Sequence, residues 1–296
     1  MSFIENNKII YGSAGFGIKN YGFSSLYPAS SQNDYLKFIY DIGLHNIDTA
    51  PAYGNSDKTI GLYNKKSKKK FKIWTKVGNL IRNSSFTFDN IFKSVKLSQE
   101  NLNVESFECL YLHQNNIEIL EDKFVQKALK EIKEMSLTKK VGVSIYNSSE
   151  LISSLSSETY DVIQLPVSAA NTYLYNLAIK QNFNKTLVAR SIFLQGTLLN
   201  IDNYSKSFNY LNEIKTIVNL LKEIAYSYKT DYLGMLLSYV MSLESLNYII
   251  VSSRNENNLK QILTHSEIEL CEEIKIEINK ISNNQNDWAN PRNWLF

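Results

Sequence analysis

The chain has 296 residues, of which 44% are hydrophobic and 21% are charged, and its formal net charge is +3. A chain of this length buries a large core without disulfides or metals, and so small a charge leaves no electrostatic footprint for nucleic acid. The two distant cysteines, Cys109 and Cys271, fit a reducing compartment. The N-terminus has no signal-peptide pattern, and the apolar helical stretch 232–243 is too short to span a membrane. We therefore expect a cytoplasmic protein that binds neither nucleic acid nor a membrane.

Short apolar segments rich in β-branched and aromatic residues recur along the chain and predict strands. The predicted strands are residues 9–13, 45–48, 71–75, 109–112, 140–143, 162–165, 187–189 and 248–251. Amphipathic segments of helical period lie between them, and the clearest are residues 34–42, 90–102 and 124–135. We expect N-caps at polar residues that precede such segments, namely Ser31, Ser56, Asp89 and Ser148.

Alternation of strands with helices predicts parallel β/α units, and the number of predicted strands is the number that closes a barrel. The fold class is therefore α/β, a (β/α)8 TIM barrel, with residues 1–296 forming a single domain. The alternative is an open doubly wound sheet, but no predicted strand is followed by a G-x-G-x-x-G turn. The terminal segment 288–296 carries apolar residues that we expect to dock on the barrel: Trp288, Trp294, Leu295 and Phe296.

Polar residues end three consecutive predicted strands. Asp48 ends the second, Lys76 follows the third and His113 follows the fourth, while Tyr53 lies in the loop just beyond Asp48. Each of these residues has an ordinary structural reading, as a turn residue, a surface charge or a packed ring. Active sites of TIM barrels lie at the carboxyl ends of the strands, so adjacency in a barrel would bring all four side chains together.

These four residue types suit proton transfer to a carbonyl group. A phenol with a pKa near 10 is a weak acid at neutral pH, and a nearby ammonium such as that of Lys76 is expected to lower its pKa. Asp48 would keep Lys76 charged through an ion pair, and His113 would orient the carbonyl oxygen. None of the four is a hydride source, so this chemistry requires a nicotinamide cofactor. A metal-dependent hydrolase is excluded because the three histidines are too scattered to form a ligand set.

The motifs around these residues resemble those of the aldo-keto reductases. The resemblance covers essentially the whole chain, and its motifs are Asp48-Thr49-Ala50-x-x-Tyr53-Gly54-x-Ser56, Trp74-Thr75-Lys76-Val77-Gly78, Leu110-Tyr111-Leu112-His113, Gly142-Val143-Ser144, Gln164-Leu165-Pro166, Arg190-Ser191 and Val251-Ser252-Ser253-Arg254. The family fold is a (β/α)8 barrel. The resemblance implies that Tyr53 is the proton donor, that Lys76 and Asp48 tune its pKa, and that His113 orients the carbonyl.

The resemblance also implies a site for NADP, with NAD as the alternative cofactor. Ser144 and Gln164 match residues that hold the nicotinamide carboxamide, and Arg190 matches a position that stacks on the nicotinamide. The pyrophosphate region corresponds to Ser191, Leu194 and Gly196, and the adenosine end to Ser252, Ser253 and Arg254.

Three positions depart from the family pattern. Ile145 stands where many members have Asn, Arg190 stands where many have an aromatic residue, and Gln261 and Ile262 replace a Glu-Asn pair near the adenine. The first functional hypothesis is an NAD(P)H-dependent oxidoreductase that reduces an aldehyde, ketone or sugar carbonyl to the alcohol, or runs the reverse reaction. The alternative is a catalytically weak, cofactor-binding regulatory or accessory protein on the same barrel. The oligomeric state is left open by the sequence.

Overall fold

The computed structural model describes residues 8–18, 32–77, 80, 88–113, 116–203, 208–266 and 268–295. Eight parallel strands hydrogen-bond in chain order, and β8 pairs with β1 to close the barrel. The strands are β1 (Ile9–Gly12), β2 (Asn46–Asp48), β3 (Lys72–Lys76), β4 (Phe107–Leu112), β5 (Thr138–Ser144), β6 (Val162–Pro166), β7 (Thr186–Arg190) and β8 (Leu246–Val251). The predicted (β/α)8 barrel is therefore confirmed, and each strand lies within two residues of its predicted ends.

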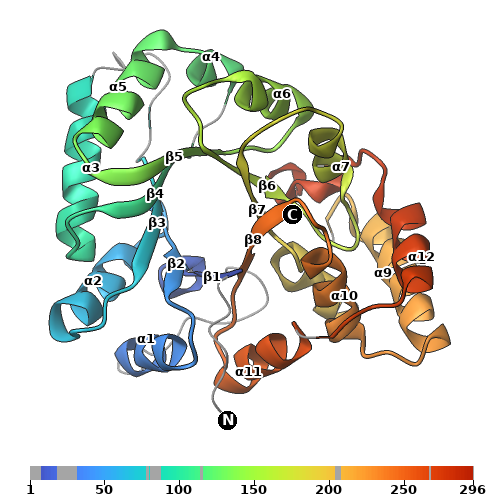
Figure 1. Cartoon of the computed structure of the whole chain (residues 1–296). Helices are drawn as coiled ribbons and strands as arrows, with labels where there is room; N and C mark the ends of the chain where they lie inside the picture. The colour runs from blue at the N-terminus through green and yellow to red at the C-terminus, as the bar shows by residue number, and fades with distance from the viewer. Residues whose placement is uncertain are drawn as a thin grey trace.

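Helices lie around the outside of the strands, as Figure 1 shows. They are α1 (Gln32–Asp41), α2 (Ser56–Lys66), α3 (Phe88–Leu102), α4 (Ile117–Leu120), α5 (Lys123–Glu134), α6 (Ser148–Ser156), α7 (Tyr173–Ile179), α8 (Thr197–Asn200), α9 (Leu211–Ser227), α10 (Tyr232–Met241), α11 (Glu256–His265) and α12 (Glu272–Ser282). Short 3-10 turns add η1 (Ala14–Phe16), η3 (Leu194–Gly196), η4 (Ile201–Asn203), η5 (Asp287–Ala289) and η6 (Pro291–Asn293). Among the described helices, none has the length and apolar character needed to cross a membrane.

The core has two layers because successive strand residues point to opposite faces. In β1, Ile9 and Tyr11 belong to the large cluster that includes the helices, whereas Ile10 belongs to a smaller cluster with Trp74 and Tyr111. That smaller cluster draws its buried members from strands distributed around the barrel. The barrel is therefore filled with packed side chains, as expected for this architecture, and the polar site lies at one end of it.

The predicted helix N-caps need correction. Ser31 lies outside the described residues, Asp89 lies inside the first turn of α3, and Ser56 is the first residue of α2 rather than its cap. In α6 the cap is Asn147 and not Ser148, because the Asn147 side chain accepts the Glu150 backbone N–H while the Glu150 carboxylate accepts the Asn147 backbone N–H. This reciprocal capping box sets the start of the helix one residue earlier than predicted.

The C-terminal segment docks on the barrel largely as expected. Trp288 and Trp294 are buried, and the Trp294 ring stacks on Phe208 at 4.7 Å between centroids. The Trp294 indole also donates to the Trp288 carbonyl oxygen at 2.9 Å. The prediction is wrong for Leu295, which is 73% exposed, and Phe296 lies outside the described residues. Two buried indoles are enough to hold the segment against the body.

We predict that Gly61→Ala destabilises the protein although alanine favours helices. A Cβ at Gly61 in α2 would lie 1.8 Å from the carbonyl oxygen of Asn101 in α3, so the two helices must separate. We expect a loss of about 1–3 kcal/mol from this overpacking, measured by urea denaturation. Leu62→Ala, at an exposed position of the same helix, is the control and should change stability far less. Equal stability of Gly61→Ala and the parent protein would contradict the close packing of α2 on α3.

Candidate active site

A cavity of about 900 Å³ opens where the strands end. Its wall includes Asp48 at the end of β2, His113 just beyond β4, Gln164 in β6, Arg190 at the end of β7 and Val251 at the end of β8. All these positions lie at or near the carboxyl ends of parallel strands, which is where TIM barrels carry their active sites.

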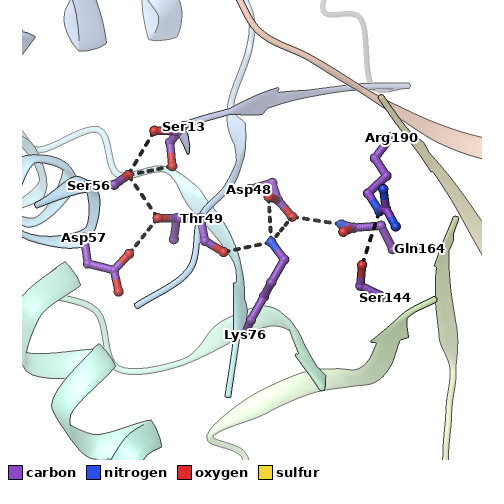
Figure 2. A network of polar contacts seen from close by, with 9 residues as sticks. All are labelled: Ser13, Asp48, Thr49, Ser56, Asp57, Lys76, Ser144, Gln164 and Arg190. Atoms are coloured by element: carbon purple, nitrogen blue, oxygen red, sulfur yellow. Dashed lines mark hydrogen bonds and ion pairs between the residues drawn. The ribbon is translucent and has the colours of Figure 1, made fainter. Parts of the chain in front are cut away.

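A buried ion pair forms the floor of this region. The Lys76 Nζ lies 2.7 Å from Asp48 Oδ1 and 2.9 Å from Oδ2, and both side chains are almost wholly buried. Lys76 also donates to the Thr49 carbonyl oxygen at 3.0 Å, and Gln164 Nε2 donates to Asp48 Oδ2 at 2.9 Å (Figure 2). Because a buried charge is costly unless it is paired and hydrogen-bonded, these contacts fix the geometry of all four residues.

A chain of hydroxyls continues from the ion pair towards α2, as Figure 2 shows. Thr49 Oγ1 donates to Asp57 Oδ1 at 2.6 Å and lies 3.1 Å from the Ser56 hydroxyl, which in turn contacts the Ser13 hydroxyl at 2.7 Å. Burial raises the pKa of Asp57, while the Thr49 hydrogen bond and Lys76 act in the opposite direction. The network ties the end of β1, the end of β2 and the first turn of α2 together.

Tyr53 occupies a tight turn between β2 and α2. Its backbone N–H donates to the Ala50 carbonyl oxygen at 2.9 Å, and Gly54 takes the left-handed φ of +58° that favours glycine. The η1 segment approaches this turn so closely that a Cβ at Gly17 would lie 1.7 Å from the Tyr53 carbonyl oxygen. The turn is therefore held from both sides, and the Tyr53 side chain lines the cavity.

The pKa of Tyr53 moves opposite to our prediction. Burial of the phenol raises its pKa well above the usual value of 10, and Asp48 and Tyr146 raise it further, while Arg190 lowers it. The lowering that we predicted from Lys76, whose Nζ lies 4.9 Å from the centre of the Tyr53 ring, does not offset the effect of burial. The phenol is therefore protonated at neutral pH.

His113 lies next to Tyr53 in the cavity. The two rings meet edge to face with their centroids 6.0 Å apart. Burial lowers the pKa of His113 to about 3, and Lys76, Arg190 and Arg292 act in the same direction. The imidazole is therefore neutral at physiological pH, so it can serve as a hydrogen-bond partner but carries no charge.

Ser144 and Gln164 are register partners on β5 and β6. Gln164 is engaged with Asp48, and the Ser144 hydroxyl accepts a hydrogen bond from Arg190 Nε at 3.3 Å. Arg190 also donates from Nη2 to the Ile145 carbonyl oxygen at 2.7 Å. The structure thus brings these residues to the same side of the cavity, with Ser144 itself behind the lining residues.

The loop after β7 has an unusual backbone. Ser191, Leu194 and Gln195 take left-handed φ angles of 59°, 48° and 56°, and Gly196 follows at 87°. Ser191, Gln195 and Gly196 line the cavity, whereas the Leu194 side chain is buried beneath it. Non-glycine residues with such angles are strained, and strained residues gather at ligand sites.

The segment after β8 lines the far end of the cavity. Ser252, Ser253 and Arg254 all contribute to the wall, as do Asn258 and Gln261 of α11. Tyr11 and Tyr35 each donate a hydroxyl hydrogen bond to the Ser253 carbonyl oxygen, at 2.7 Å and 2.9 Å. A Cβ at Gly15 would lie 2.9 Å from Arg254 Nε, so the glycine leaves room for the guanidinium.

Two further wall residues fall outside the set predicted from the sequence. Tyr146 follows β5, and Arg292 belongs to the C-terminal turn η6. Tyr146 could have been predicted from the sequence as a wall residue, because it comes two residues after the polar strand end at Ser144. No sequence pattern predicts Arg292 as a wall residue, since only the tertiary fold brings the C-terminal segment to the carboxyl ends of the strands.

The comparisons with known proteins agree with this geometry. A family model described as "Aldo/keto reductase family" matches residues 8–283. The chain belongs to the aldo/keto reductase family. Membership places it among carbonyl oxidoreductases in general terms, and it bears out the resemblance seen in the motifs.

Solved structures of aldo-keto reductases share the fold. The holo form of an aldo-keto reductase from Bacillus halodurans has a TM-score of 0.76 at 16% identity and covers 95% of this chain and 94% of its own. The glycerol dehydrogenase from Gluconobacter oxydans has a TM-score of 0.72 at 18% identity, with the same coverage of 95% and 94%. These low identities establish likeness of fold alone.

One curated relative matches at higher identity over a shorter stretch. D-arabinose 1-dehydrogenase from Saccharomyces cerevisiae is 30% identical over a match of 122 residues, and the match covers 38% of this chain. The match spans 36% of that relative's length.

We predict that Asp48→Asn strongly destabilises the aldo/keto reductase barrel. The substitution leaves the buried Lys76 ammonium without its anionic partner, and loss of one member of a buried pair costs about 3–5 kcal/mol. Asp57→Asn is the matched control, because that carboxylate is also buried but accepts its hydrogen bond from the neutral Thr49 hydroxyl. It should cost about 1 kcal/mol. The free energy of unfolding of both variants is measured by urea denaturation. Equal losses of stability in Asp48→Asn and Asp57→Asn would show that the ion pair has no special role.

Proposed function

We propose that this protein is an NAD(P)H-dependent oxidoreductase that reduces a small aldehyde, ketone or sugar carbonyl to the alcohol, or catalyses the reverse reaction. The observation that carries the proposal is the meeting of Tyr53 and His113 in one cavity, directly above the buried Asp48–Lys76 pair. Family membership supports the same class of reaction.

Tyr53 is the proposed proton donor, and His113 is the residue that positions the carbonyl. The raised pKa of Tyr53 keeps the phenol protonated, so its O–H can donate to the carbonyl oxygen. The neutral His113 donates a second hydrogen bond to the same oxygen from a ring N–H and fixes its direction. When the proton has moved, the Lys76 ammonium near the Tyr53 ring stabilises the phenolate electrostatically. Together these groups neutralise the oxygen as charge develops on it.

The cavity fits a dinucleotide. It runs from Tyr53 and His113 at the reacting end to Arg254 at the other, past the left-handed loop that holds Ser191 and Gly196. A bound nicotinamide cofactor would supply the hydride. Gln164 and Ser144 would hold its carboxamide, Arg190 would stack on its ring, Ser191 and the Leu194–Gly196 turn would contact its pyrophosphate, and Ser252, Ser253 and Arg254 would contact its adenosine end. Arg254 offers a planar cation that suits the 2′-phosphate, which supports NADP over NAD.

The names of two similar proteins support the proposal of a small, polar substrate. D-arabinose 1-dehydrogenase and glycerol dehydrogenase are named for small polyhydroxy compounds. We propose a small carbonyl or alcohol compound as the substrate here, sugars included. The cavity is consistent with this, because its wall mixes Phe193 and Tyr146 with polar Asn200 and Gln195.

We predict that Tyr53→Phe lowers kcat by about 10²- to 10⁴-fold, because it removes the proton donor and little else. NADPH should still bind, as followed by quenching of tryptophan fluorescence, and a weaker response to NADH would support the assignment of Arg254. The control is Tyr160→Phe, which also removes a buried hydroxyl but outside the cavity wall. Full activity of Tyr53→Phe would refute its role. Tight cofactor binding by the parent protein without turnover of any carbonyl would instead favour the regulatory alternative.

We predict different pH profiles for the two reaction directions. Tyr53 has a raised pKa and His113 a lowered one of about 3, so neither should titrate between about pH 5 and pH 9. Carbonyl reduction should therefore be nearly flat over that range. Alcohol oxidation needs the phenolate and should rise about tenfold per pH unit. Initial rates in both directions test this, and an inflection of the reduction profile near pH 6.5 that disappears in His113→Gln would contradict a neutral His113.

A further inference from the structure

Two arginines enclose the ring of Tyr146 at the cavity wall. The guanidinium carbon of Arg190 lies 3.9 Å from the ring centre, and that of Arg292 lies 3.2 Å from it. Both are too close to the ring centre to share one face without overlapping each other, so they occupy opposite faces. Tyr146 therefore holds two cations near one another, and all three residues line the cavity.

The surrounding structure keeps these side chains in place. The Tyr146 backbone N–H donates to the Glu150 carboxylate at 2.6 Å, in the capping box that begins α6. Arg190 donates to the Ile145 carbonyl oxygen at 2.7 Å, and the buried Trp294 anchors the segment that carries Arg292. A site built from such anchored groups is preorganised for a ligand.

Arg190 and Arg292 lie in a cavity wall that contains little negative charge among the residues that the structure describes. Asp48 is the one acidic residue among the described residues of the cavity wall, and Lys76 already neutralises it. Within the described part of the chain, neither Arg190 nor Arg292 forms an ion pair with an acid. Clustered like charges without a counter-charge favour binding of an anion.

Glu150 acts on the pKa of Arg292 from behind the wall without forming an ion pair with it. It raises that pKa, whereas burial and Arg190 lower it. Its carboxylate already accepts the backbone N–H groups of Tyr146 and Asn147. Arg292 donates from Nε to Asn290 Oδ1 at 3.3 Å, and among the described residues its two Nη groups have no hydrogen-bond partner, so they are available to a ligand in the cavity.

The cluster lies close to the reacting groups. Arg190, Tyr146 and Arg292 line the same cavity as Tyr53 and His113. In agreement with this, both arginines act on the pKa of His113. A small molecule whose carbonyl reaches Tyr53 and His113 can therefore place a second group against the arginines. Arg292 is the one available for this contact, since Arg190 is the proposed stacking partner of the nicotinamide.

We propose that Arg292, stacked on Tyr146, binds an anionic group of the substrate, so that the preferred substrates are small carbonyl compounds bearing a carboxylate or a phosphate. This substrate class rests on the proposed reductase function and narrows it. The planar fork of a guanidinium suits both anions through paired N–H donors. Binding at this point also turns the carbonyl end of the molecule towards Tyr53.

The test compares matched anionic and neutral substrates. One pair is 4-carboxybenzaldehyde and its methyl ester, and the other is glyceraldehyde 3-phosphate and glyceraldehyde, so the two pairs distinguish carboxylate from phosphate. The parent protein should have the higher kcat/KM for the anionic member of at least one pair. In Arg292→Gln the ratio of anionic to neutral kcat/KM should fall by about 10- to 100-fold, mainly through KM. Arg292→Lys keeps the positive charge but loses the paired N–H donors of the guanidinium, so its ratio should lie between those of the parent protein and Arg292→Gln.

Two controls separate an effect at this site from a general loss of positive charge and from weaker cofactor binding. Lys280→Gln removes the same charge from an exposed helical position and should leave the ratio unchanged. The dissociation constant of NADPH, measured by fluorescence, should not change in Arg292→Gln. A ratio that is unaffected by Arg292→Gln, or an effect on NADPH binding alone, would overturn the proposal.

A failure of the proposed function would be recognised separately. If no carbonyl is turned over, binding at the anion site can still be measured by calorimetric titration of the NADPH-loaded protein with 4-carboxybenzaldehyde and with its methyl ester. Tighter binding of the acid that is lost in Arg292→Gln would support the site without the reaction. The proposed anion site would be overturned if the acid and the ester bound equally and glyceraldehyde and its phosphate also bound equally.

Discussion

Much of the site depends on one buried ion pair, that between Lys76 and Asp48. Each charge loses its hydration on burial, a penalty of several kcal/mol that is recovered only with good geometry and further hydrogen bonds. Here the ammonium has both carboxylate oxygens and the Thr49 carbonyl as acceptors, and the carboxylate also accepts from Gln164. The pair therefore joins β2, β3 and β6 at their carboxyl ends. Tyr53 lies above it, so the position of the proposed proton donor follows from the same interaction.

The sequence carries enough to predict the barrel and the location of the site. Strand periodicity is a local property, and parallel strands bring their carboxyl ends to one edge, so Asp48, Lys76 and His113 can be grouped from the sequence alone. The direction of the Tyr53 pKa cannot be predicted in the same way. It depends on how deeply the phenol is buried and on the Lys76 charge lying over the ring while Asp48 balances it. Orientation and desolvation are tertiary properties that residue spacing does not encode.

Smaller errors have the same origin. Ser148 and Asn147 are both good caps, and the choice between them is made by Glu150, whose buried carboxylate accepts the Asn147 backbone N–H. The apolar pattern predicts that Leu295 docks with its neighbouring tryptophans, but the 3-10 turns of the C-terminal segment point it to solvent while they bury Trp294. Those same turns bring Arg292 to the cavity wall, although it lies nearly half the chain length away from Tyr146 in the sequence. No local pattern pairs the two.

The arginines and the phenol are electrostatically coupled, and this gives the charge of the substrate a second consequence. Arg190 lowers the pKa of Tyr53 against the larger effect of burial. An anionic group bound beside Arg190 and Arg292 would offset that positive potential and leave the phenol more firmly protonated. The phenol is already protonated at neutral pH, so this shift would not change its charge state and would make it a slightly weaker acid. The benefit of the anion would therefore lie in orienting the carbonyl, and discrimination against a neutral substrate would act through binding and positioning.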